Sequence, residues 1–291
     1  MNFFKYRKIP LAWLLLSRQP LRLLVAIAGI SFAGILMFMQ IGFRDGLFDT
    51  SVTIHNLLDA DLVLISPRSK SSISMSGFPK RRLIQALAQN EVKSISPVNL
   101  NYLLWRNPEN LKTRSILALG FNPNDSILLD KEFSQKANLL KNPGRVLFDS
   151  LSRPEFGPVE EWFKSGRRVQ TEVAGKRVLV EGLVELGPSF GADGNLITST
   201  ETYLKLFPAN PKGSIEIGLV KLMANSDSKK VSQILNKSLP SDVRVLTKDE
   251  FIEFEKNYWK TSTAIGFIFS LGAFMGFIVG CVVVYQILYS D

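Results

Sequence analysis

The chain has 291 residues, 46% of them hydrophobic, so it is long enough for one or two domains and more apolar than a typical soluble enzyme. Its formal net charge is +9, but basic and acidic side chains are intermixed over residues 44–260, without the basic stripe of a DNA-binding protein. Nucleic acid is therefore not an expected partner. The single cysteine, Cys281, lies in an apolar segment, so a packed core rather than disulfides must stabilise the fold.

Residues 1–22 form the first expected element. Residues 3–19 are apolar and basic, and Pro10 suits the first turn of a helix. The pattern predicts an amphipathic helix along the cytoplasmic membrane surface. A disordered tail is the alternative.

Residues 23–43 carry no charge and predict a first transmembrane helix. At 1.5 Å per residue the segment is about 31 Å long, which matches the hydrocarbon core of a bilayer. It is longer than the apolar part of a cleaved signal peptide, and no small-residue cleavage site follows it. The basic residues before it place the N-terminus in the cytoplasm: Lys5, Arg7, Lys8, Arg18 and Arg22.

Residues 44–260 are expected to form a periplasmic α+β domain with a helical stalk at each end. The first stalk continues the first span over residues 44–59. Strands and helices alternate beyond it, and a boundary between two subdomains is conceivable at residues 150–157. Strands are predicted at 61–66, 114–120, 145–148, 168–173, 176–186, 196–198, 215–222 and 243–246, and helices at 79–89, 200–207 and 227–239.

Two capping boxes mark helix starts in this domain. One comprises Thr198 and Glu201. The other, Thr247 and Glu250, opens the second stalk, whose sequence FIEFEKNYWK is expected to run straight into the second span. The stalk residues singled out are Thr247, Glu250, Phe251, Phe254 and Trp259. Two stalks entering adjacent spans predict a mechanical linkage, although they could also serve only as spacers.

Residues 261–289 predict the second transmembrane helix, with residues 290–291 at the cytoplasmic end. Gly272, Gly276 and Gly280 recur at four-residue intervals, which allows a neighbouring helix to approach closely. The sequence leaves open whether that neighbour is the first span or a second copy. The expected location is the inner (plasma) membrane, with both termini in the cytoplasm.

Catalytic motifs are missing from the sequence. It contains no G-x-x-x-x-G-K-[ST], H-E-x-x-H, C-x-x-C or G-x-S-x-G pattern. The only histidine, His55, falls in the first stalk, and no functional role is assigned to it. The turn-rich stretch GADGN (191–195) predicts a turn rather than a calcium or phosphate site. No catalytic residue, cofactor or metal is therefore expected.

Several long stretches resemble the DevC-type permease subunits of cyanobacterial heterocyst glycolipid exporters, within the broader MacB/FtsX family of ABC permeases. These stretches include SRPEFGP (152–158), SFGADGNLITS (189–199), LDADLVLISPRS (58–69) and FEKNYWKTSTAIGFIFSLGAFMGFIVG (254–280). The resemblance implies a MacB-like periplasmic domain and no enzymatic activity in this chain. It also implies a permease homodimer, a separate ABC ATPase subunit, a membrane fusion protein, a TolC-like outer-membrane channel reached through it, and export of a glycolipid or another amphiphile.

Family members have a coupling helix and two further spans beyond the point that corresponds to Asp291. The expectation is therefore a truncated, split or frameshifted permease. Two alternatives remain open at this stage: a periplasmic ligand sensor whose signalling module is missing, and a non-functional remnant.

Overall fold

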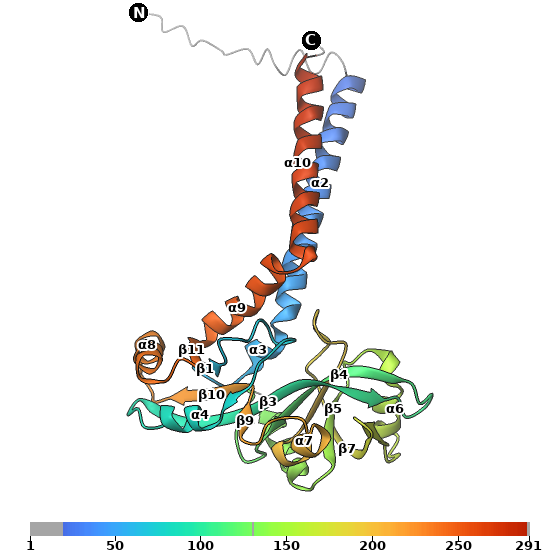
Figure 1. Cartoon of the computed structure of the whole chain (residues 1–291). Coiled ribbons are helices and arrows are strands. Elements are labelled where there is room, and N and C mark those ends of the chain that lie inside the picture. Colours follow the sequence, from blue (N-terminus) through green and yellow to red (C-terminus); the bar gives the residue numbers. More distant parts are fainter. Residues whose placement is uncertain (1–19, 130, 290–291) are drawn as a thin grey trace, which may run out of the picture. The chain divides into compact units, whose positions relative to one another are not determined.

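The computed structural model describes residues 20–129 and 131–289, which form two compact units (Figure 1). The first unit comprises the described residues up to Gly46 and from Lys260 onward, and the second comprises Leu47–Trp259. The surface helix predicted within residues 1–22 and the cytoplasmic end at 290–291 fall outside the described residues, apart from the start of α2.

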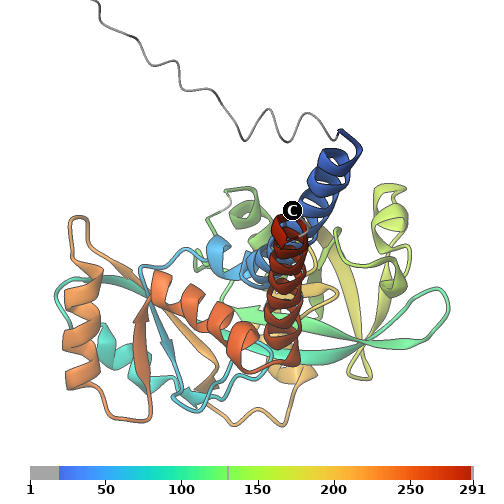
Figure 2. The same ribbon diagram turned by 90° about the horizontal axis from the view of Figure 1, so that it is seen from above.

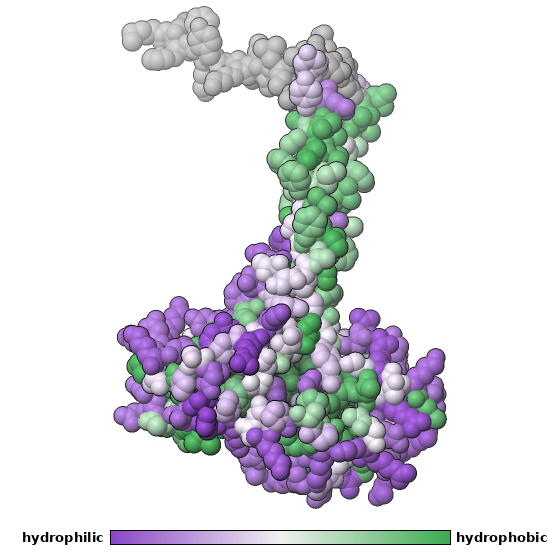
Figure 3. Space-filling model, in the orientation of Figure 1, coloured by the Kyte–Doolittle hydropathy of each residue, from purple (hydrophilic) through white to green (hydrophobic). Residues whose placement is uncertain are grey.

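The first unit consists mainly of two long apolar helices, α2 (Pro20–Ser51) and α10 (Ala264–Tyr289). Residues Leu23–Ser51 and Ala264–Gln286 are long and apolar enough to cross a bilayer, with mean hydropathies of 2.2 and 2.5. Only 6% of each span's most apolar stretch is buried within the protein, so neither helix is a core helix of a soluble fold. Their surfaces are hydrophobic in Figure 3. These are features of a membrane protein.

The second stalk does not run straight into the second span, contrary to the sequence prediction. Helix α9 (Lys248–Thr261) ends before a bend at residues 262–263, and α10 starts at Ala264. The hydroxyl residues of this segment favour a break because their side chains compete for backbone hydrogen bonds. The carbonyl oxygen of Lys260 lies so close to Gly266 that a Cβ there would be 2.0 Å from it. A side chain at position 266 would therefore clash with this carbonyl oxygen, and glycine avoids the clash.

The first stalk is helical, as predicted, but it is interrupted at Val52. Helix α2 ends at Ser51 and the short α3 (Thr53–Leu57) follows. Thr50 and Ser51 donate their hydroxyls to the carbonyls of Leu47 and Phe48. Such back-bonding bends helices, which accounts for the interruption.

The second unit is built on a nine-stranded mixed sheet in the order β11-β1-β10-β3-β4-β8-β5-β7-β6. The strands are β1 (Leu62–Ile65), β2 (Phe78–Pro79), β3 (Val92–Arg106), β4 (Thr113–Phe121), β5 (Arg145–Asp149), β6 (Gln170–Val173), β7 (Lys176–Val184), β8 (Asn195–Ser199), β9 (Ser214–Ile215), β10 (Ile217–Leu222) and β11 (Arg244–Thr247). The remaining helices are α4 (Arg81–Ala86), α5 (Lys131–Ala137), α6 (Val159–Lys164), α7 (Thr200–Leu206) and α8 (Ser228–Ser238), with 3-10 turns η1 (Asn138–Lys141) and η2 (Pro154–Phe156).

One end of the sheet is a ferredoxin-like sandwich, here called the sandwich lobe. Its elements follow the order β1-α4-β3-β10-α8-β11, and the strands pair antiparallel in the order β11-β1-β10-β3. Helices α4 and α8 cover one face, where Leu83 and Leu235 pack on Leu62 and Leu64 of β1. Figure 2 shows α8 beside β11 at the edge of this lobe.

The other end of the sheet closes on itself and is called the barrel lobe. Strands β3-β4-β8-β5-β7-β6 follow one another, and β6 returns to β3 through the pair Trp105 and Val173. Alternate residues of all six strands point inward to one apolar cluster, around Trp105 and Phe148. Ala174 and Gly175 take positive φ at the β6–β7 turn, and the two strands that this turn joins lie within the ranges predicted as strands, 168–173 and 176–186.

Strand β3 joins the two lobes, and the sequence analysis did not predict it. It pairs with β10 up to Val98 and with β4 from Val98 onward. Pro97 argues against a strand at this position of the sequence, because proline is disfavoured inside a sheet. Pro97 is tolerated because it lies just before the β4 pairing begins, so β3 has a neighbour on only one side there.

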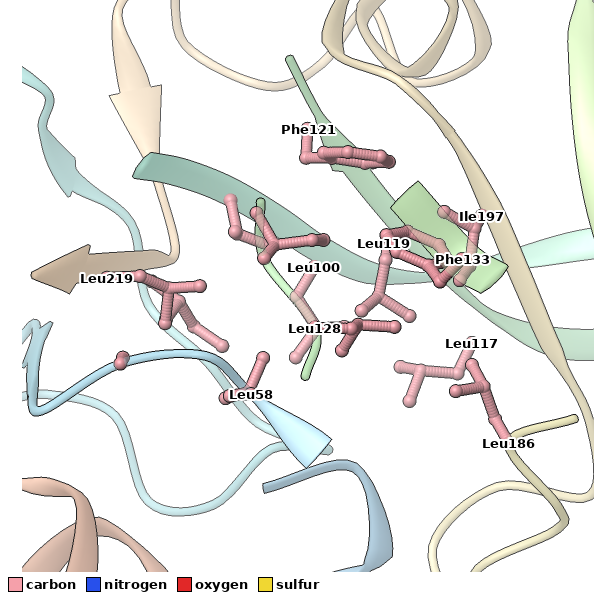
Figure 4. Packing of buried hydrophobic residues seen from close by; sticks show 14 of the residues in the cluster. Leu58, Leu100, Leu117, Leu119, Phe121, Leu128, Phe133, Leu186, Ile197 and Leu219 are labelled. Carbon is pink, nitrogen blue, oxygen red and sulfur yellow. The ribbon is translucent and has the colours of Figure 1, made fainter. Parts of the chain in front are cut away.

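A third apolar cluster lies on the face of the sheet that carries α9 (Figure 4). It continues from Leu219 of the sandwich lobe to Leu119 and Ile197 of the barrel lobe, and Phe251 of α9 is 1% exposed within it. Since one core spans both lobes, the second unit is a single packed body.

Two local predictions need correction. Residues 150–157 are no subdomain boundary, because Phe156 of η2 is buried in the barrel core beside Phe148. The cap of α7 is Ser199 rather than Thr198. Ser199 accepts from the amide of Thr202, whereas Thr198 lies within β8.

Candidate functional site

Within the second unit, polar contacts attach helix α9 to the first stalk and to the loop 66–77, and those of Glu255 are buried. We call this contact zone, formed by residues 47–58, 66–77 and 248–259, the stalk junction. Its chemical centre is Glu255, whose side chain is 2% exposed. The hydrogen-bond partners of that carboxylate show which segments of the chain meet in this zone.

Glu255 holds three segments together. Its Oε2 accepts from the amide of Ser72 at 2.7 Å and from the Ser72 hydroxyl at 3.0 Å. Its Oε1 accepts from Trp259 Nε1 at 2.9 Å. Nε2 of His55, in α3, lies 3.6 Å from Oε2 and 2.8 Å from the Ser72 hydroxyl. One buried carboxylate thus joins α3, the loop and α9.

Serine, histidine and glutamate in contact suggest a catalytic triad, but the geometry differs from one. In a triad the two ring nitrogens of histidine are divided between the acid and the nucleophile. Here Nε2 of His55 faces both Ser72 and Glu255, and Nδ1 has no hydrogen-bond partner within the described part of the chain. The arrangement orders the loop and provides no proton relay.

The protonation of Glu255 follows from its surroundings. Burial raises the pKa of this carboxyl, but the hydrogen bond and charge of His55, with the Ser72 amide and Trp259, outweigh burial and hold the pKa below its usual value. Glu255 is therefore a carboxylate at neutral pH.

Further contacts tie α9 to the first stalk. Lys256 Nζ lies 2.7 Å from Oδ1 of Asp49. Lys248, at the start of α9, donates to the carbonyls of Asn56 and Leu58 at 2.9 and 2.7 Å. The contacts are spread along the helix, so α9 is attached to residues 49–58 near its start and again at Lys256.

The stalk residues singled out from the sequence occupy this zone. Thr247 and Glu250 form the predicted capping box, because Glu250 Oε2 accepts from the Thr247 amide and Thr247 Oγ1 from the Glu250 amide. Phe251 lies 4.6 Å from the ring of His55, and the Arg244 guanidinium lies 5.0 Å from the Phe254 ring. Their role in transmitting motion stays a prediction.

Trp259 also contacts a loop of the barrel lobe. The ring of Phe190 meets it edge-on, with centroids 4.6 Å apart. A Cβ on Gly191 would lie 3.3 Å from Trp259 and 2.6 Å from Ile73, so the loop is closely packed. Tyr102 of β3 donates its hydroxyl to the Gly191 carbonyl. The loop 189–195 therefore connects α9 with the barrel lobe.

The stretches 152–158 and 189–199, singled out above for their resemblance to the permease family, meet at this loop. Asp193 accepts from Arg153 at 2.8 Å and from Arg114 at 2.7 Å. Nearby, the fully buried Asp149 accepts from Asn195 Nδ2 at 2.7 Å. Asp149 also accepts from the amides of Leu151, Leu186 and Gly187. The carboxylates of Asp149 and Asp193 therefore interact with groups of the protein itself.

Within residues 20–129 and 131–289, no group of three or more histidine, cysteine, aspartate or glutamate residues is arranged to hold a metal ion. The stretch 191–195, predicted as a turn, lies in the loop after β7 and ends at Asn195, the first residue of β8.

The glycines singled out for helix packing lie in the first unit, away from this zone in sequence. Gly272, Gly276 and Gly280 of α10 face Gln40, Met37 and Ala33 of α2, at 3.0–3.7 Å from where a Cβ would stand. The neighbour in the structure is thus the first span of the same chain. A glycine requirement for this packing stays a prediction.

The sequence patterns do not indicate the polar centre of the zone. They assign no role to His55 and do not single out Ser72, Tyr102 or Glu255. The signal available was the charge of Glu255 within an otherwise apolar face of the second stalk, next to Phe251 and Trp259.

No family profile matches the chain, and no curated protein matches it. Solved structures with a similar fold include the following three. The periplasmic region of MacB from Actinobacillus actinomycetemcomitans has 12% identity and a TM-score of 0.45, covering 70% of this chain and 96% of that one. The extracellular domain of the noncanonic ABC-type transporter YknZ from Gram-positive bacteria has 13% identity and a TM-score of 0.44, with 64% and 99% covered. A domain of a putative permease from Porphyromonas gingivalis has 14% identity and a TM-score of 0.35, with 66% and 89% covered. Similarity at this level assigns no function.

Proposed function

We propose that the chain is a permease subunit of an ABC exporter. Two spans anchor it in the inner membrane with both termini in the cytoplasm, and the second unit folds on the periplasmic side. A separate ATPase supplies the energy, and this chain transmits the resulting motion. A membrane fusion protein and, through it, a TolC-like outer-membrane channel receive the cargo, which is a glycolipid or another amphiphile. Two permease copies work together.

One observation carries this proposal. Two of the stretches that resemble DevC-type permeases, 152–158 and 189–199, contact each other through Arg153 and Asp193. The second of them also packs on Trp259 of α9. Two of the segments that carry the family resemblance therefore link the second stalk with the barrel lobe.

The contacts support a transmission role. Glu255, Lys248 and Lys256 hold α9 rigidly to residues 49–58 and 72. A displacement of α9 would carry Trp259 against Phe190 and Gly191, and from there reach β3 through Tyr102. Coupling of this kind needs a continuous set of packed contacts with two arrangements. The proposal therefore requires that α9 takes a second position during transport.

The test is copurification followed by a coupling assay. A tagged chain should retain an ABC ATPase from its own cells after detergent extraction. In proteoliposomes with the ATPase and the fusion protein, Glu255→Ala should lower export several-fold while ATP hydrolysis continues. Glu253→Ala, on the exposed side of α9, is the matched control. If no ATPase is retained, and a periplasmic ligand instead changes the conformation of the chain, the result would favour a ligand sensor over a permease.

A further inference from the structure

A cavity of about 400 Å³ lies on the barrel lobe between the turn after α6 and strand β7. Three arginines, Arg145, Arg167 and Arg168, line it together with Glu181. We call it the arginine pocket. It has no part in the stalk junction, and its size falls in the range of small-ligand sites.

The charge of the pocket is not neutralised within the described chain. Arg145 Nη1 pairs with Glu181 Oε2 at 2.7 Å, which satisfies that carboxylate. Neither Arg167 nor Arg168 makes an ion pair with a described carboxylate. Two guanidinium groups are thus free to bind an anion.

Arg167 is held in place before any ligand arrives. Its guanidinium lies 3.5 Å from the centre of the Trp162 ring, and its amide donates to the Trp162 carbonyl at 2.9 Å. Gly166, with φ of +81°, allows the tight turn that presents both arginines. A planar guanidinium stacked on an aromatic ring loses little freedom when it binds a carboxylate or phosphate.

Apolar side chains form the rest of the lining. Phe163 and Leu179 are half-buried, and Val180 is 3% exposed. Cationic and apolar walls in one cavity suit a ligand with both characters.

We propose that the arginine pocket binds an anionic ligand in which a phosphate or carboxylate is attached to an apolar group. The guanidinium groups of Arg167 and Arg168 hold the anion, and Phe163 and Leu179 contact the apolar part. This assignment does not depend on the exporter function, since it rests on the barrel lobe alone.

The test uses the full chain in phosphatidylcholine nanodiscs, titrated calorimetrically with phenyl phosphate, inorganic phosphate and phenol. Phenyl phosphate should bind about ten-fold or more tightly than inorganic phosphate, and phenol should not bind measurably. Arg167→Gln and Arg168→Gln each remove one charge-assisted contact with the anion. Each should weaken the binding of phenyl phosphate by roughly ten-fold. The double variant should lose binding, and Arg167→Lys, which keeps the charge without the planar stack, should be intermediate.

Arg177→Gln is the matched control, because Arg177 is exposed on β7 but does not line the pocket. It should bind phenyl phosphate as the wild type does. Equal binding of inorganic phosphate and phenyl phosphate would overturn the apolar part of the assignment and indicate a site for a free anion. No binding of any probe, or unchanged binding in the double variant, would overturn the site itself.

Discussion

The carboxylate of Glu255 lies 2.7 Å from the amide nitrogen of Ser72, although 183 residues separate the two in the chain. Ser72 belongs to the loop that follows β1, and Glu255 to the helix that precedes the second span. The same carboxylate also binds Trp259 and faces His55. A single buried group therefore decides how α9 is held against the second unit.

Glu255→Ala should be strongly destabilising. The substitution leaves the Ser72 amide and Trp259 Nε1 without their acceptor in a buried site, and it removes the carboxylate that faces Nε2 of His55. Removing one member of a buried charged network costs about 3–5 kcal/mol. Thermal unfolding of the full chain in detergent, followed by circular dichroism, measures it. Glu253→Ala should change little, and equal losses in both variants would contradict the role given to Glu255.

The same group predicts an acid-sensitive stability. Because the folded pKa of Glu255 lies below the unfolded value of 4.5, the unfolded state takes up a proton first as the pH falls. The stabilisation is complete above about pH 4.5 and is lost as the pH falls through the folded pKa. Melting temperatures measured from pH 7 to pH 3 should therefore fall more steeply for the wild type than for Glu255→Gln. If the melting temperatures of the two proteins fell in parallel, Glu255 would not contribute to the pH dependence of stability.

Asp149→Ala should disrupt the loops at residues 150–157 and 185–194 together. Asp149 is fully buried and accepts from three amides and from Asn195. We expect a loss of about 3–5 kcal/mol, and a smaller loss for Asp149→Asn, which keeps one carbonyl acceptor. Glu161→Ala, at an exposed position of α6, is the control. Limited proteolysis should show early cleavage near residues 150–157 and 189–195 in Asp149→Ala alone.

Gly266→Ala should disturb the bend before the second span. Its Cβ would stand 2.0 Å from the Lys260 carbonyl oxygen, so backbone must move. Overpacking of this kind costs about 1–3 kcal/mol. Gly34→Ala is the matched control, because nothing lies within 4 Å of its Cβ position. Alanine there should leave thermal stability unchanged or slightly raised, and equal effects at both positions would argue against a fixed bend.

The sequence predicted the parts of the fold that local patterns specify. The two apolar helices, the strands β6 and β7 and the cap at Thr247 and Glu250 follow from hydropathy, alternation and side-chain chemistry. Strand β3 was missed because Pro97 argues locally against a strand, and its tolerance depends on where β4 starts.

The candidate site was less predictable for the same reason. Ser72 and Glu255 become neighbours only when β1 and α9 pack on the same core, and no spacing in the sequence indicates it. The bend at residues 262–263 was missed because helical propensity was extended across three hydroxyl residues and Gly266. Tertiary contacts decided the first outcome, and local backbone geometry decided the second.

The central claim is that the second unit folds outside the inner membrane, between two spans. Labelling of a single cysteine tests it most directly. In a Cys281→Ser background, Lys237→Cys places a thiol on the exposed side of α8. A membrane-impermeant maleimide added to intact spheroplasts should label this cysteine as fully as it does after lysis. Labelling that occurs only after lysis would contradict the account.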